Sequence, residues 1–266
     1  MTSTARNVLL GVAVLLALGA AALALLNLFR PGAGKVKLHV YCGTSMRGAA
    51  EEIAQEYERR TGDHVEFNFG GSETLLPMVE ASGRGDLFIT HDPFPEELAR
   101  KGLVARYETG GYLEPLIVVA KGNPLGLKGL ADLAKPGLRV GLMDARYSTC
   151  GQMVQDALKR RGLTDKVGPN VRVEKRSHQE LATDVTLGSL DAAAVWNFSA
   201  VLNREKLDAV PTGETFPETR LCICLLRSAA NPKGAGRFTE LCASEFGREV
   251  FSRHGYSKGM GAKPQQ

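Results

Sequence analysis

The stretch VKLHVYCGTSM, residues 36–46, places alternating apolar residues directly before a glycine and two hydroxyl side chains. This alternation predicts a β-strand over 36–41, and the apolar spacing that follows predicts a helix over 45–60. The same order then recurs as a strand over 65–69, a helix beginning at Ser72, and a short strand over 86–90. Repeated strand–helix units of this length are typical of α/β proteins with a mostly parallel sheet.

A second set of strand and helix patterns follows an apolar run over 112–120. It comprises a helical turn over 130–133, strands over 138–143, 171–174 and 191–196, and helices over 149–161 and 178–187. A late strand over 221–226 and a final helix within 236–254 complete the pattern. We therefore predict two α/β lobes, each with a mixed, mostly parallel sheet. Lobe 1 is expected to span 36–114 and 212–266, and lobe 2 to span 115–211.

The N-terminus carries a long apolar segment. Val8 to Phe29 is 22 residues without a charge, between Arg6 and Arg30. A helix needs about 20 such residues to cross a bilayer, whereas the apolar part of a cleaved signal is about 7–15 residues long. The length favours a membrane anchor over 1–30 and leaves a cleaved signal as the alternative, with a short linker over 31–35. Either segment would export the body of the protein, so we expect it outside the cytoplasm.

Charge and cysteine content exclude several classes of function. The net charge of +4 falls to +2 without Arg6 and Arg30, and this near-neutral body gives no support for nucleic-acid binding, which usually shows as a basic stripe. The five cysteines, an odd number, leave at least one thiol unpaired and make one disulfide plausible. Their spacing is not that of a structural zinc site, and we expect no metal or organic cofactor.

Four loops at predicted strand ends are rich in small and hydroxyl residues: 43–45, 70–74, 147–151 and 177–178. Ligands bind at the carboxyl ends of parallel strands, and the N-terminus of a helix offers free amide N–H groups to an anion. Each loop taken singly is also consistent with ordinary capping, and Thr149 with Gln152 fits a capping box. The series of four loops favours an anion site.

Several motifs in these regions resemble the periplasmic molybdate- and tungstate-binding proteins of ABC importers, a branch of the type II solute-binding proteins. VYCGTSM (residues 40–46) is similar to the opening strand and serine loop of that family, and TGDHVEFNFGGSETL (61–75) to its second strand and serine loop. GDLFIT (85–90) and GSLDAAAVW (188–196) resemble two further elements. The resemblance covers about residues 36–260 and implies a two-lobed periplasmic-binding-protein fold. It also implies that the protein is a binding protein and not an enzyme.

The resemblance also implies how the ligand is held. The family binds a tetrahedral oxyanion through neutral donors from both lobes. Ser45 and Ser72 would donate hydroxyl groups, and the backbone at Cys150 and His178 would donate from the other side. Trp196 stands where the family usually has a tyrosine. Three residues of the same loops complete the expected ligand-binding set: Thr44, Gly71 and Thr149. The implied ligand is molybdate or tungstate, the implied partner is an ABC permease, and the protein is expected to be a monomer.

Two other functions stay open from the residues themselves. Cys150, in the first helical turn, could form an enzyme nucleophile with His178, oriented by Asp144 or Asn197.

The other alternative is a tethered receptor for a carboxylate, sulfate or phosphate-like anion, because Arg146 and Arg176 lie close to the proposed loops. Within the binding hypothesis, Glu73 beside Ser72 would repel a dianion unless it is paired or turned to solvent. Cys42 and Cys150 both flank ligand loops, where we expect small buried residues, with a disulfide between them as the alternative.

Overall fold

The computed structural model describes residues 36–259. The predicted anchor or signal over 1–30 and the linker over 31–35 lie outside these residues. Among the residues described, no helix is long and apolar enough to cross a membrane.

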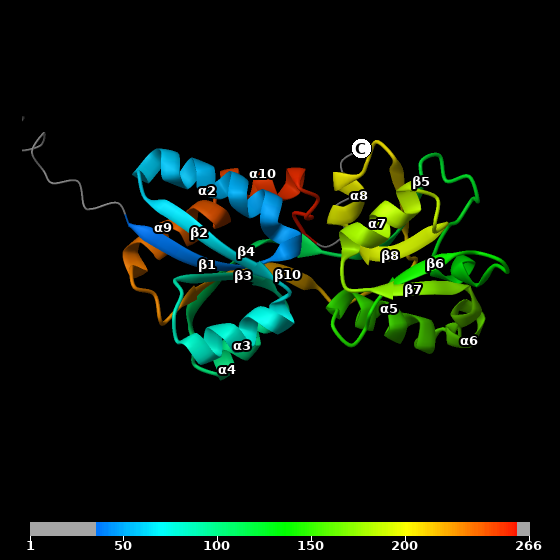
Figure 1. Ribbon diagram of the computed structural model, residues 1–266, viewed down its shortest axis with the longest axis horizontal. Coiled ribbons are helices and arrows are strands. Elements are labelled where there is room, and N and C mark those ends of the chain that lie inside the picture. Colours follow the sequence, from blue (N-terminus) through cyan, green and yellow to red (C-terminus); the bar gives the residue numbers. More distant parts are fainter. Residues whose placement is uncertain (1–35, 260–266) are drawn as a thin grey trace, which may run out of the picture. The chain divides into compact units, whose positions relative to one another are not determined.

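The first sheet has five strands in the order β2-β1-β3-β10-β4. These are β1 (Lys37–Gly43), β2 (His64–Gly70), β3 (Leu87–His91), β4 (Val104–Leu113) and β10 (Thr219–Leu226). Strands β2, β1 and β3 are parallel, and β10 is antiparallel to both of its neighbours. Helices α2 (Arg47–Thr61), α9 (Pro232–Ala243) and α10 (Glu245–Arg253) cover one face of this sheet, and α3 (Ser72–Ser82) and α4 (Phe94–Arg100) cover the other (Figure 1).

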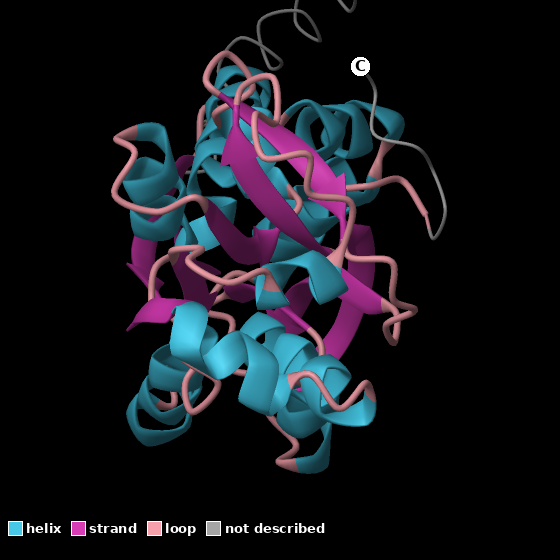
Figure 2. Cartoon of the chain, turned by 90° about the vertical axis from the view of Figure 1, so that its right-hand side faces the viewer, coloured by secondary structure: helices cyan, strands magenta, loops and turns pink. Residues whose placement is uncertain are grey.

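The second sheet also has five strands, in the order β7-β6-β8-β5-β9. These are β5 (Pro115–Ala120), β6 (Val140–Met143), β7 (Val171–Lys175), β8 (Ala192–Trp196) and β9 (Leu207–Pro211). Its helices are α5 (Thr149–Arg160), α6 (Thr164–Val167), α7 (His178–Thr186) and α8 (Phe198–Leu202), and Figure 2 shows helices on both sides of the strands. Short 3-10 turns are η1 (Thr44–Met46), η2 (Leu130–Ala134) and η3 (Gly168–Asn170).

The predicted fold class is confirmed. In each sheet three adjacent strands are parallel and one strand, β10 or β5, runs against its neighbours, which makes both sheets mixed and mostly parallel. The exact limits of the two lobes stay a prediction.

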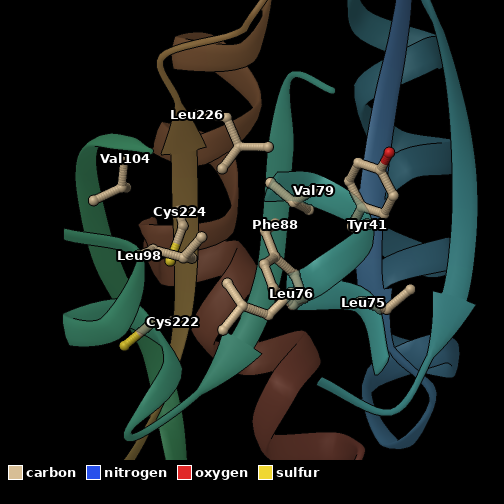
Figure 3. Packing of buried hydrophobic residues seen from close by; sticks show 10 residues of the cluster. All are labelled: Tyr41, Leu75, Leu76, Val79, Phe88, Leu98, Val104, Cys222, Cys224 and Leu226. Carbon is tan, nitrogen blue, oxygen red and sulfur yellow. The ribbon is translucent and has the colours of Figure 1, made fainter. Parts of the chain in front are cut away.

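A buried apolar cluster fixes α3 against the first sheet. Figure 3 shows Leu75, Leu76 and Val79 of α3 packed among Tyr41, Phe88 and the two cysteines of β10. Cys222 and Cys224 both belong to this cluster, as expected for residues two apart on a strand. The packing holds the first turn of α3 at the end of β2, where the predicted ligand loop lies.

The structure refines two sequence-based expectations and excludes one alternative. The region 236–254 contains the final helix, α10, but its first part belongs to a separate helix, α9, because the Ser244 hydroxyl accepts from the amide of Gly247 and starts α10 anew. The single apolar run over 112–120 is divided between β4, which ends at Leu113, and β5. The plausible disulfide is absent: all five cysteines, which lie within the described part of the chain, are free and buried, so Cys42 and Cys150 are not bridged.

Candidate functional site

The predicted residues of the first sheet lie at the ends of two neighbouring strands. Strands β1 and β2 are parallel and pair in register up to Gly43 and Gly70. Thr44 and Ser45 follow the first end, and Gly71 and Ser72 follow the second. The structure therefore brings the two predicted loops to one edge of the sheet, the edge at which α/β proteins bind ligands.

Ser72 is a buried hydroxyl with an unused proton. It begins α3 and is 4% exposed. Its Oγ accepts a hydrogen bond from Oγ1 of Thr90 at 2.8 Å, so its own O–H can be donated to a ligand. Thr90, in β3, was not identified from the sequence as a site residue. The signal was present, because β3 is the third parallel strand and ends at the same edge.

Ser45 is held from the C-terminal part of the chain. Its carbonyl oxygen accepts from the hydroxyl of Tyr256 at 2.6 Å, and the Tyr256 ring stacks on Phe198 with 5.9 Å between centroids. Burial raises the pKa of Tyr256, which keeps the hydroxyl protonated and able to donate. Ser45 is half-buried and the neighbouring Thr44 is exposed. Tyr256 is a second contributor that the sequence did not reveal.

The first turn of α5 presents the amide of Cys150. The helix is capped by Ser148, whose Oγ accepts from the amide of Gly151 at 3.2 Å, so the capping box predicted at Thr149 is wrong. Thr149 is the first, half-buried residue of the helix. Within residues 36–259 the N–H of Cys150 has no hydrogen-bond partner. This is the donor that the resemblance implies at Cys150.

The first turn of α7 presents His178. Ser177 caps this helix by accepting from the amide of Glu180 at 3.3 Å, and no acceptor for the N–H of His178 is found in the described part of the chain. The imidazole Nδ1 of His178 lies 3.3 Å from the backbone N–H of Trp196, which donates to it. Trp196 is 2% exposed. Burial, with a smaller contribution from His91, lowers the pKa of His178 to about 3, so the ring is neutral with its proton on Nε2.

Two contacts join the strand-end edges of the two sheets. Arg176, just before α7, donates to the carboxylate of Glu73 in the first turn of α3 at 3.3 Å. Its guanidinium also lies 4.1 Å from the centre of the Tyr147 ring, in the loop before α5. His91, at the end of β3, contacts the ring of Trp196 at a centroid distance of 6.2 Å. The loops predicted to bind a ligand are thus brought together from both sheets.

The side chains that a Cys150 nucleophile would require are either buried or already bonded to other groups. The Cys150 thiol is fully buried and burial raises its pKa, which disfavours a thiolate. Asp144 pairs with Arg146 at 2.7 Å. The Asn197 side chain bonds the backbone of Glu114 and Tyr112. Neither polar group is positioned to orient His178.

In the part of the chain that the structure describes, neither a cluster of metal-binding side chains nor a surface hollow marks these loops. In residues 36–259 no group of three or more His, Cys, Asp or Glu side chains is arranged to hold a metal ion. Two surface hollows of about 170 Å³ and about 290 Å³ lie on the second-sheet side, and none of the eight predicted ligand residues lines either one. The candidate site is instead the set of strand-end loops that contact one another, with Ser72 and Trp196 buried among them.

The chain is similar to several known proteins in sequence and in fold. A putative binding protein of Haemophilus influenzae is 26% identical over 220 residues, covering 82% of this chain and 90% of its own length. The molybdate-binding protein ModA of Mycobacterium tuberculosis is 25% identical over 238 residues, covering 86% and 87%. The substrate-binding domain of a putative molybdenum ABC transporter from Clostridium difficile superposes with a TM-score of 0.70 at 20% identity, covering 85% and 100%. The bacterial extracellular solute-binding protein family matches residues 38–257, and the chain belongs to that family.

Proposed function

We propose that this protein binds a tetrahedral oxyanion, molybdate or tungstate, outside the cytoplasm and delivers it to an ABC permease. The relative from Mycobacterium tuberculosis is a molybdate-binding protein by name, and the similarity extends over most of both chains. When the two lobes close around the anion, the protein would adopt the closed form that the permease recognises.

One observation carries the proposal: helices α5 and α7 present free first-turn amides, at Cys150 and His178, on edges that contact the Ser72 side of the first sheet. Free N–H groups at helix N-termini bind anions through hydrogen bonds and the helix dipole. The Ser72 hydroxyl adds a neutral donor whose direction is fixed by Thr90. Thr44, Ser45, Gly71 and Thr149 complete the proposed contact set.

The charges near the site favour such an oxyanion over a carboxylate receptor. A carboxylate ligand is usually held by a free arginine, but Arg146 already pairs with Asp144 and Arg176 with Glu73. The dianion would therefore be held by uncharged donors. We propose that the indole N–H of Trp196 supplies the contact for which the resembling family uses a tyrosine hydroxyl.

Calorimetric titration of the full-length protein with molybdate, tungstate, sulfate and phosphate tests the proposal. We expect tight 1:1 binding of molybdate or tungstate, with sulfate and phosphate weaker. Preference for phosphate or sulfate would reassign the ligand, and absence of heat and of thermal stabilisation with all four anions would overturn the oxyanion function.

We further propose that the segment over 1–30 stays attached as a membrane anchor, that the protein acts as a monomer, and that it has no catalytic role. The burial of Cys150 and the engagement of Asp144 and Asn197 support the last point. Extraction of membranes with carbonate and with detergent distinguishes an anchored chain from a released one, and light scattering of the purified protein gives its mass in solution.

A further inference from the structure

His91 is a half-buried imidazole at the strand-end edge of the first sheet that has no role in the site described above. It ends β3, directly after Thr90. Its Nδ1 lies 2.7 Å from the carbonyl oxygen of Asp92. A carbonyl oxygen can only accept, so Nδ1 carries the proton and Nε2 is the nitrogen that gains a proton when the ring becomes charged.

His178, from the second sheet, has the opposite tautomer. Its Nδ1 accepts from the backbone N–H of Trp196, so its proton is on Nε2. Both imidazoles contact the ring of Trp196, each at a centroid distance of 6.2 Å. One imidazole from each sheet therefore lies at Trp196, where the resembling family has a ligand-binding tyrosine.

The charged groups around this pair leave it neutral in the absence of a ligand. Asp92 and Glu73 act on His91 and raise its pKa, but the larger effect of burial lowers it. His178 experiences burial and the charge of His91, and both lower its pKa. The other side chains in ring contact with them are uncharged: Phe94 with His91, Phe198 with His178, and Trp196 with both. The arginines around these groups are paired with carboxylates: Arg220 with Asp92, Arg176 with Glu73 and Arg146 with Asp144.

We propose that His91 is a further ligand-binding residue and that the His91–His178 pair takes up a proton from solvent when a dianionic oxyanion binds. The proton is added to Nε2 of His91, which changes from an acceptor that repels the anion to an N–H⁺ donor that binds it. Release of the anion returns the proton to solvent. The inference rests on the proposed function and deepens it, because it makes capture of a dianion dependent on pH.

Titration calorimetry of the full-length protein with molybdate and with tungstate, at pH 6, 7 and 8, measures this linkage. Repeating each titration in buffers of different ionisation enthalpy gives the number of protons taken up per anion. We expect net uptake of about one proton, with the dissociation constant rising by up to about tenfold per pH unit as pH increases. His91→Asn keeps a donor for the Asp92 carbonyl but cannot titrate, and is expected to remove most of the uptake.

His178→Asn keeps an oxygen acceptor for the Trp196 amide and serves as the partner variant, with a smaller loss of uptake expected. His64→Asn is the matched control, because His64 is exposed and begins β2 at the opposite edge of the sheet. Binding that is independent of pH and unchanged in proton uptake by His91→Asn would overturn the inference and leave the proposed function intact. Failure of the wild-type protein to bind any of these anions would overturn both.

Discussion

At the residue scale, His178 is subject to two opposing electrostatic effects whose sizes can be compared. Burial lowers its pKa from 6.5 to about 3, which corresponds to about 5 kcal/mol against the charged ring. A dianion about 4 Å from the ring contributes about 8 kcal/mol in favour of that charge at an effective dielectric constant of about 20. A dianion at that distance therefore outweighs even the burial of His178, and the neighbouring His91, whose Nε2 receives the proton, can become charged when the ligand enters.

The Ser72 hydroxyl gives the first prediction. Ser72→Ala removes a neutral donor to an anion, and such charge-assisted bonds contribute about 1.5–3 kcal/mol, or about 10- to 150-fold in affinity. We expect weaker molybdate binding by calorimetry and a smaller loss with Thr90→Val, which removes the group that orients Ser72. Ser82→Ala, at the other end of α3, is the control. Equal affinity of Ser72→Ala and wild type would place the anion elsewhere.

Glu73 gives a prediction of opposite sign. Its carboxylate lies against Gly71, close to the proposed anion position, and pairs with Arg176. Glu73→Gln removes a like charge and frees the guanidinium, so we expect molybdate to bind about three- to tenfold more tightly. Glu80→Gln, in the same helix but paired with Lys101, is the matched control. Weaker binding by Glu73→Gln would show that the carboxylate supports the site rather than opposing the ligand.

At the element scale, the parts of the fold that were predictable are those with strong local patterns. Strands β1 and β2 end at a glycine, and helices α2, α5 and α7 show a clear apolar period with a glycine or hydroxyl residue near an end. Strands β6 and β8 are short apolar runs. Strand β4 was missed over most of its length because the middle of the run VARYETGGYL is polar or glycine and its burial alternates irregularly. Its place depends on pairing with β10, more than a hundred residues later.

The candidate site divides in the same way. Ser45, Ser72, Cys150 and His178 could be proposed from the sequence because loops before helices carry a readable signal and match motifs of the resembling family. Three further residues contact partners that are distant in sequence. Thr90 donates a hydrogen bond to Ser72, the His91 ring contacts Trp196, and the Tyr256 hydroxyl donates to the carbonyl of Ser45. No local sequence pattern predicts such contacts, because they form only when the chain has folded and the strands lie side by side.

The start of α5 gives a prediction that belongs to an element. A methyl group on Gly151 would meet the carbonyl group of Met143 and, at 3.0 Å, the amide nitrogen of Ala145. Gly151→Ala must therefore push the helix start away from the end of β6, at about 1–3 kcal/mol. We expect a melting temperature lower by several degrees and weaker anion binding. Gly168→Ala, where nothing lies within 4 Å, is the control. An unchanged melting temperature would show that this packing is loose.

At the scale of the whole molecule, the buried imidazoles make stability depend on pH. The pKa values of His91 and His178 are lower in the folded protein than in the unfolded chain. As the pH falls below about 6.5, the unfolded chain binds protons that the folded protein excludes, so stability is lost. His178, whose pKa is about 3, accounts for up to about 2 kcal/mol of this loss between pH 6.5 and pH 5, and His91 adds to it in the same direction. Asp92, Asp144 and Asp191 have lowered pKa values and their stabilisation is lost at still lower pH, below about 4.

Urea unfolding between pH 8 and pH 5 separates these contributions, since it stays above the range in which the carboxylates titrate. Without an anion we expect the midpoint to fall as the pH is lowered. With excess molybdate the fall should be smaller, because the bound state holds the protons that the empty state excludes. The double variant His91→Asn/His178→Asn should flatten the anion-free curve, while His64→Asn should follow the wild-type protein. A wild-type midpoint that is constant from pH 8 to pH 5 would show that both rings are solvated in the empty protein. Anion binding would then have no lowered histidine pKa to raise.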